Sequence, residues 1–228
     1  ILLMLGLAFI IIAIARPQTG SKMEKTKRKG VELMILLDVS NSMLAQDIKP
    51  NRLERAKQAI GKLIEKLEND RIGIVVFAGK PYTQLPITSD FVAAKMFTST
   101  ITTDMIPTQG TAIGSAIETA LNSFSINDKT RNKAIVIIYD GENHEDDAVE
   151  AAKEASDKGI YIHTIGMGLP TGTPIPIFKN GIAAGFKLDA DGNTVVTKLN
   201  ETMLQEIAVA GKGMYVRANN TEIGLNKI

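Results

Sequence analysis

Short hydrophobic runs alternate with longer segments in which hydrophobic residues recur every three or four positions. Runs of the first kind are typical of strands covered on both faces, and the second spacing is typical of helices with one buried face. The predicted strands lie at 31–37, 71–79, 133–139, 160–168 and 213–218. The predicted helices lie at 51–70, 89–100, 111–124, 146–158 and 200–210. This alternation predicts an α/β fold with a doubly wound, mostly parallel sheet, Rossmann-like, and helices on both faces.

Two segments depart from that alternation. Residues 80–88 contain two prolines and alternate in polarity, which predicts an antiparallel sixth strand at the sheet edge. Residues 170–198 carry turn signals without helical periodicity, and we expect a β-hairpin insertion there with Asp191-Gly192 at its tip. The main domain is expected to span residues 31–218, with the insertion inside it.

The first fifteen residues are uncharged, strongly apolar and followed by Arg16-Pro17. A complete membrane span needs about 20 apolar residues, so residues 1–15 are interpreted as the C-terminal part of a transmembrane helix. A signal-peptide core and a buried core helix are the alternatives, although the first lacks a cleavage site and the second would normally show a polar face.

Charge is distributed unevenly near the N-terminus. Residues 16–30, the predicted juxtamembrane linker, hold six basic residues and one acidic residue, an excess that favours the cytoplasmic side of a membrane. Over the whole chain, 26 basic residues nearly balance 25 acidic ones, so the charge does not suggest nucleic-acid binding. Cysteine is absent, which excludes disulfides, thiolate metal sites and cysteine nucleophiles.

Polar residues with oxygen donors follow the predicted strands at three places. Asp38, Ser40 and Ser42 follow the first strand, Thr111 precedes a helix, and Asp140 follows strand 133–139. In an open parallel sheet, ligands bind at the carboxyl ends of the strands, so we expect these side chains to meet there. Carboxylate and hydroxyl oxygens favour Mg²⁺, Mn²⁺ or Ca²⁺ over zinc or copper.

The first of these segments has a regular spacing. In extended backbone, residues i, i+2 and i+4 point the same way, so Asp38, Ser40 and Ser42 could face one ion. Two carboxylates would only just neutralise a divalent cation. Mg²⁺ takes six ligands and usually keeps waters, which leaves a position for an incoming carboxylate.

The three segments together resemble the D-x-S-x-S…T…D metal-ion-dependent adhesion site of the von Willebrand factor A domain. The similarity covers roughly residues 30–218. It implies that the three hydroxyls bind the ion directly and that the two carboxylates act directly or through water. It also implies a partner-binding rim, for which we name Asn41, Met43, Gly110, Gly141 and Glu142, and a partner Asp or Glu that completes the coordination of the metal.

Within that family, the chain resembles the bacterial Bat (aerotolerance-type) membrane proteins, and among them the BatB group. The resemblance rests on ARPQ after the apolar segment, on DVSNSMLAQDIKPNRLERAK and on DGENHEDD. It implies membrane anchoring on both sides of the A domain, with the tail 219–228 leading toward the second anchor. It further implies assembly with other Bat proteins and coupling to a MoxR-type AAA+ ATPase. The family's usual arrangement places the domain in the periplasm, against the direction of the basic linker, and we favour the periplasm slightly.

Two other function classes stay open. A phosphotransfer domain of the haloacid-dehalogenase or receiver type would use Asp38 as nucleophile beside Mg²⁺, but such hydrolases have a second carboxylate where this chain has Ser40. A structural scaffold without metal is the other. Interaction rather than catalysis is the preferred interpretation, and no nucleotide-binding motif is present.

Residues near Asp140 raise two smaller questions. Glu142, His144, Glu145, Asp146 and Asp147 could form a second metal site, although acidic residues in the first turn of a helix are explained by its dipole. Tyr139 stands where many A domains have Ser or Thr. We expect its ring to pack against a loop rather than to narrow the approach to the site.

Overall fold

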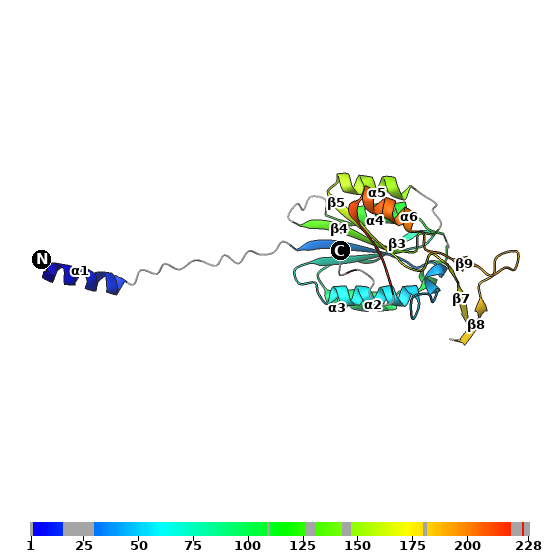
Figure 1. Cartoon of the computed structure of the whole chain (residues 1–228), viewed down its shortest axis with the longest axis horizontal. Coiled ribbons are helices and arrows are strands. Elements are labelled where there is room, and N and C mark those ends of the chain that lie inside the picture. The colour runs from blue at the N-terminus through cyan, green and yellow to red at the C-terminus, as the bar shows by residue number, and fades with distance from the viewer. Residues whose placement is uncertain are drawn as a thin grey trace.

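A six-stranded sheet runs through the centre of the structure, with helices on both faces (Figure 1). The computed structural model describes residues 2–15, 30–108, 110–125, 131–142, 147–179, 182–219 and 225. The strands are β1 (Val31–Asp38), β2 (Arg71–Phe77), β3 (Pro81–Thr88), β4 (Asn132–Tyr139), β5 (Ile160–Gly166) and β10 (Lys212–Arg217). Their order in the sheet is β10-β5-β4-β1-β2-β3. All neighbours pair in parallel except β2 and β3, so the predicted antiparallel edge strand and the α/β fold class are confirmed.

The helices divide between the two faces of the sheet (Figure 1). On one face lie α2 (Arg52–Ile64) and α3 (Phe91–Thr100), and on the other lie α4 (Ile113–Ser123), α5 (Ala148–Asp157) and α6 (Glu201–Ala210). Each face has its own hydrophobic cluster. In β1, Leu36 belongs to the cluster beneath α4, α5 and α6, and Leu37 belongs to the cluster beneath α2. Both side chains are fully buried, which explains why the central strands are hydrophobic without alternation.

Side-chain caps define where two of these helices begin. The Asn51 side chain accepts a hydrogen bond from the Glu54 amide at 2.7 Å, so Asn51 caps the start of α2. For α3 the cap is Asp90, whose carboxylate accepts from the amides of Val92 and Ala93, and Ser89 lies one residue outside. The helix predicted from residue 89 therefore begins at Phe91, two residues later.

The N-terminal segment contains α1 (Leu2–Ala15), a helix with no charged residue. Within the ranges given above, the structure has no helix both long enough and apolar enough to cross a membrane. Residues 16–29 of the basic linker lie outside the described residues. The transmembrane interpretation of residues 1–15 therefore stays a prediction.

The insertion after β5 is more elaborate than one hairpin. β6 (Thr173–Pro174) pairs with β9 (Val196–Thr197), and β7 (Pro176–Lys179) pairs with β8 (Ile182–Phe186), both antiparallel. A bridge between Leu188 and Thr194 closes a further turn, and Asp191-Gly192 lies inside that turn. The insertion thus contains two small ribbons that project from one end of the main sheet (Figure 1).

Arg52, at the first position of α2, ties that insertion to the sheet. It is the largest side chain in the described structure with almost no exposed surface. Its guanidinium donates to both carboxylate oxygens of Asp47, at 2.9 and 2.7 Å. It also donates to Asp140 after β4 and to the Thr197 hydroxyl in β9, each at 2.9 Å. One buried cation therefore holds the start of α2, the end of β4 and the base of the insertion together.

Replacing this cation tests how far the fold depends on it. We expect Arg52→Met to lower the free energy of unfolding by about 3–5 kcal/mol, because Asp47 and Asp140 would be left buried without their partner. Urea unfolding in the presence of a chelator measures the change. Lys62→Met, an exposed change in the same helix, is the matched control and should cost no more than about 0.5 kcal/mol.

Adding Asp140→Asn to Arg52→Met should recover part of the loss, because the second change removes one of the unpaired charges. Equal stability of Arg52→Met and Lys62→Met would contradict the proposed role of the cation.

Candidate functional site

The first and last segments of the predicted site meet because β1 and β4 are parallel neighbours. Leu37 pairs with Ile138, so Asp38 stands beside Tyr139, and Asp140 follows one residue later. Both carboxylates are fully buried. Both side chains therefore lie at the carboxyl-terminal edge of the sheet.

The loop after β1 holds Asp38 and the two serines in direct contact. The Ser40 amide donates to Asp38 Oδ1 at 2.8 Å, and its hydroxyl donates to Oδ2 at 2.9 Å. The hydroxyl oxygens of Ser40 and Ser42 lie 2.8 Å apart. Ser42 is in turn hydrogen-bonded to the Asp140 carboxylate. These contacts form a continuous chain of oxygen atoms from β1 to β4.

The prediction that Asp38, Ser40 and Ser42 meet because they alternate along extended backbone is only partly correct. Ser40 has extended backbone, but a 3₁₀ turn, η1 (Asn41–Leu44), begins directly after it. Ser42 therefore reaches the site from a turn and not from the third position of an extended strand. The side chains converge although the simple alternation ends.

Thr111 lies two residues before α4 and is buried. Its hydroxyl donates to the Glu142 carbonyl at 3.3 Å, and the same carbonyl accepts from the Tyr139 hydroxyl. The Glu142 amide donates to Asp140 Oδ1 at 3.1 Å. Thr111 thus joins the loop after β4, one hydrogen-bonded residue away from Asp140.

Burial and charge act on the two carboxylates together. Burial raises the pKa of Asp38 well above its ordinary value, and the neighbouring charge of Asp140 raises it further. Burial also raises the pKa of Asp140, while the Arg52 guanidinium opposes that rise. Two adjacent carboxylates in a water-poor site favour either a bound proton or a bound cation.

The five rim residues fall into two groups. Asn41, Gly110 and Glu142 are partly exposed at the edge of the site. Met43 is fully buried in the core and Gly141 is buried, so neither could touch a partner, and their assignment to the rim was wrong. The 3₁₀ turn directs Met43 inward.

Gly141 is required for a different reason. Its φ is +78°, and a Cβ there would lie 2.4 Å from the Asn200 carbonyl oxygen. The backbone of the loop after β4 therefore runs directly against the start of α6.

We expected the Tyr139 ring to pack against a loop, and it packs instead against Phe77 of β2. It is fully buried and lies edge-on to Phe77, with ring centroids 5.9 Å apart. Its hydroxyl donates to the Glu142 carbonyl, and burial raises the pKa of this phenol above its ordinary range. Through its hydroxyl, Tyr139 therefore holds the loop after β4 against the sheet.

Sequence reasoning missed three residues that border the site: Asp47, Arg52 and Thr197. Asp47 binds Arg52 and also accepts a hydrogen bond from the Leu169 amide at 2.8 Å. Arg52 bonding lowers the Asp47 pKa against the opposing effect of burial. A basic residue at the start of a helix is usually solvated, so the position of Arg52 gave no sign of its burial. The only indication in the sequence was Asp47, an acidic residue five positions earlier.

The second polar cluster is only partly described. His144, Glu145 and Asp146 lie in 143–146, outside the described residues. Asp147 caps α5 by accepting from the Glu150 amide at 3.0 Å, and the Glu142 carboxylate accepts from the Lys198 amide. Across the described ranges, no group of three or more His, Cys, Asp or Glu side chains is placed to hold a metal. The hydroxyl-rich site is of a different kind.

Comparison with known proteins agrees with this geometry. The sequence pattern of the von Willebrand factor type A domain matches residues 33–142. BatB from Bacteroides thetaiotaomicron is 53% identical, with 84% of this chain and 91% of that chain aligned and a TM-score of 0.80. An aerotolerance-related membrane protein from Bacteroides fragilis is 52% identical, with 87% and 100% aligned and a TM-score of 0.79.

More distant matches add two facts. Proximal thread matrix protein 1 from the mussel byssus, solved with a zinc-occupied adhesion motif, shares the fold at 17% identity, with 87% of this chain and 43% of that chain aligned and a TM-score of 0.62. A UPF0353 protein from Nocardia farcinica is 30% identical over 97% of this chain and 67% of its own length. The chain spans about two thirds of the length of such relatives, or 64% for one from Mycolicibacterium paratuberculosis. This chain is 53% identical to BatB over 84% of its own residues, and it therefore belongs to the Bat-type proteins with a von Willebrand factor type A domain.

Proposed function

We propose that Asp38, Ser40, Ser42, Thr111 and Asp140 hold a divalent cation, Mg²⁺ first and Mn²⁺ or Ca²⁺ as alternatives, and that the ion binds a carboxylate of a partner protein. The observation that carries this proposal is the unbroken contact from Asp38 through both serines to Asp140. These are hard oxygen ligands on a rigid edge of the sheet. The chemistry supplied by the ion is electrostatic attraction of an acidic side chain.

The charges of the site fit this role. Asp38, Asp47, Asp140 and Arg52 are three carboxylates and one guanidinium in mutual contact or close neighbourhood, with a net charge of −2 when ionised. One divalent cation neutralises them. Because the remaining donors are uncharged hydroxyls, the ion keeps its attraction for one more carboxylate.

The two alternatives agree less well with the geometry. As a nucleophile, Asp38 would need a free oxygen facing the substrate, yet both of its oxygens accept hydrogen bonds from Ser40 and the side chain is buried. A scaffold without metal gives no reason to bury two carboxylates whose pKa values burial raises. Interaction without catalysis is therefore the function we infer.

The Bat-type relatives support a setting at a membrane, because one of them is named as an aerotolerance-related membrane protein. We infer that the domain is anchored in the bacterial inner membrane through the apolar segment at its N-terminus, on the periplasmic side. The partners would be other Bat proteins and a MoxR-type AAA+ ATPase acting on the assembly. Protease digestion of spheroplasts tests the side: a periplasmic domain is cut without lysis, and a domain cut only after lysis is cytoplasmic.

Metal binding should stabilise the folded chain. At a Mg²⁺ concentration 100 times the dissociation constant, the gain is about 2.7 kcal/mol, which corresponds to a rise in Tm of roughly 5–10 °C for a domain of this size. Differential scanning fluorimetry with Mg²⁺ against a chelator measures it. Asp38→Ala and Ser42→Ala should each lose the rise, whereas Asp191→Ala, an exposed change in the insertion, should keep it. An equal rise in Asp38→Ala and the unchanged protein would disprove the site.

The pKa of Asp38 gives this effect a pH dependence with a definite sign. In the unfolded chain the carboxyl titrates near its ordinary pKa of about 4, and burial raises that pKa in the folded protein. The metal-free fold therefore binds the proton more tightly. Protonation of Asp38 therefore stabilises the metal-free folded state, and this stabilisation increases as the pH falls from the raised pKa toward about 4. Mg²⁺ must displace this proton, so the Mg²⁺-induced rise in Tm should be larger near pH 8 than near pH 5.

The comparison is made by repeating the melts with and without Mg²⁺ across that pH range. Asp38→Asn removes the titrating group and should show no metal-induced rise at any pH. A rise of the same size at both ends of the range would count against a cation that competes with the proton.

A further inference from the structure

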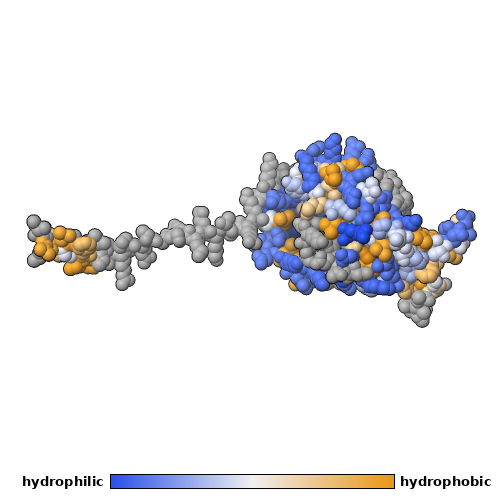
Figure 2. All heavy atoms as spheres, in the orientation of Figure 1, coloured by the Kyte–Doolittle hydropathy of each residue, from blue (hydrophilic) through white to orange (hydrophobic). Residues whose placement is uncertain are grey.

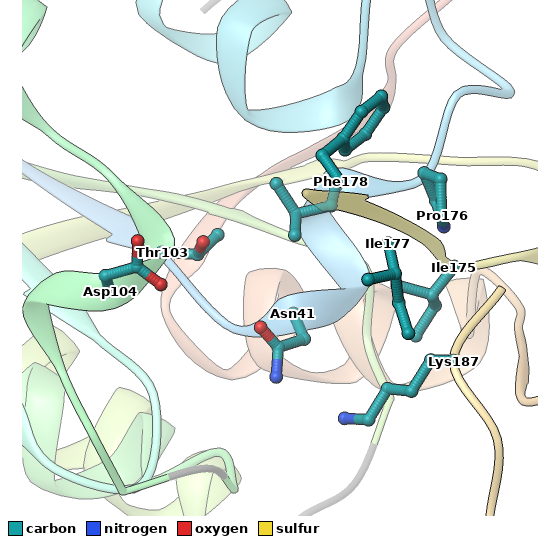
Figure 3. Close-up of a pocket in the computed structure, with 9 residues that line it drawn as sticks. Asn41, Thr103, Asp104, Ile175, Pro176, Ile177, Phe178 and Lys187 are labelled. Carbon is teal, nitrogen blue, oxygen red and sulfur yellow. The ribbon is translucent and has the colours of Figure 1, made fainter. Parts of the chain in front are cut away.

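A cleft of about 460 Å³ lies beside the metal site proposed above (Figure 3). One wall is the start of the insertion, residues 175–178, together with Lys187. The opposite wall comes from η1, through Asn41 and Leu44, and from η2 (Thr103–Met105). The cleft therefore lies between the insertion and the turn that carries Ser42.

Asn41 connects the cleft to the metal site. It stands between Ser40 and Ser42 in sequence and lines the cleft with its side chain. Figure 3 shows Asn41 between Thr103 and Asp104 on one side and the insertion on the other. A chain whose carboxylate sits at the serines would therefore continue directly over Asn41 into the cleft.

The insertion wall is apolar and partly exposed. Ile175 and Pro176 are buried at its base, while Ile177 and Phe178 have 39% and 43% of their surface exposed. Phe186 and Leu188 of the same insertion are more than half exposed. Figure 2 shows hydrophobic surface over this part of the molecule. Exposed apolar side chains gathered beside a polar site are typical of protein-binding surfaces.

The charges of the cleft favour an acidic occupant near its metal end. Lys187 is the one basic side chain among the lining residues, and its ammonium points toward the same space as Asn41 (Figure 3). Within the described ranges, no ion pair involves Lys187. An ammonium group that lines the cleft adds to the attraction of the proposed cation for a segment that carries a carboxylate. Asp104, on the opposite wall, repels a second acidic residue in the same segment.

We propose that this cleft and the metal site together bind one extended segment of a partner protein, with an Asp or Glu at the ion and a Leu or Ile side chain in the cleft. The inference rests on the proposed metal site and adds the chemistry of the partner. The aliphatic side chain contacts Leu44, Ile175 and Ile177. The carboxylate supplies attraction, and the fixed distance between ion and cleft selects the spacing between the two partner residues.

A peptide panel tests this pairing with the full purified chain. Fluorescein-labelled peptides of Gly and Ser carry one Asp alone, one Leu alone, or both at separations of one to six residues. In Mg²⁺, we expect one separation to bind about tenfold tighter than Asp alone, as for one leucine side chain leaving water into a half-open cleft. Fluorescence anisotropy gives the dissociation constants. A gain that is the same at every separation would overturn the proposal.

Variants assign the gain to the cleft. Ile177→Ser should reduce the tenfold gain to less than about twofold while leaving the affinity for the Asp-only peptide unchanged. Val209→Ser, an exposed aliphatic change on α6, is the matched control and should keep the full gain. If Ile177→Ser keeps the gain, or if Val209→Ser loses it equally, the cleft does not hold the leucine.

The experiment separates this inference from the function on which it rests. Binding of the Asp-only peptide that ignores a chelator and survives Ser42→Ala disproves the metal site. Mg²⁺-dependent binding of that peptide with no further gain from Leu leaves the metal site intact and overturns only the cleft. A dimer of the chain in sedimentation that Ile177→Ser dissociates would show that a second copy occupies the cleft, which also overturns the proposal.

Discussion

The burial of two carboxylates at the ends of adjacent parallel strands is the constraint on which the rest of the site depends. Asp38 and Asp140 are fully buried, burial raises the pKa of both carboxyls, and the charge of Asp140 raises the pKa of Asp38 further. Such a pair is tolerated in a folded protein only where hydrogen bonds and positive charge compensate it. The compensation visible in the structure comes from Ser40, Ser42 and the guanidinium of Arg52.

Arg52 compensates the buried negative charge only in part. It binds Asp47 through two hydrogen bonds and Asp140 through one, so its single charge is shared between two carboxylates. Asp38 receives only hydroxyl and amide donors from its own loop. The negative charge left over is concentrated at β1, beside the serine hydroxyls. In the proposed metal-bound state, a divalent ion at that place neutralises the negative charge that Arg52 leaves uncompensated.

The sequence predicted the sheet well, because each central strand is buried on both faces and hydrophobic throughout. It predicted the proximity of Asp38 and Asp140 for a related reason: the carboxyl ends of β1 and β4 must lie side by side once the strands are parallel neighbours. The rim assignment of Met43, which came from the family resemblance, was wrong because the 3₁₀ turn that begins at Asn41 places that side chain in the core. Local spacing carries no signal for such a change in backbone.

Long-range contacts explain the other failures. Thr197 reaches Arg52 across 145 residues, and β6 pairs with β9 over the whole length of the insertion. Neither contact leaves a periodic trace in the sequence.

The same contacts also bear on specificity for a partner, because a cation that attracts any exposed Asp or Glu cannot by itself distinguish one partner from another. Arg52 and Asp47 hold Thr197 and Leu169, at the base of the insertion, close to Asp140. In the function proposed above, this arrangement is what selects one carboxylate-bearing segment over another.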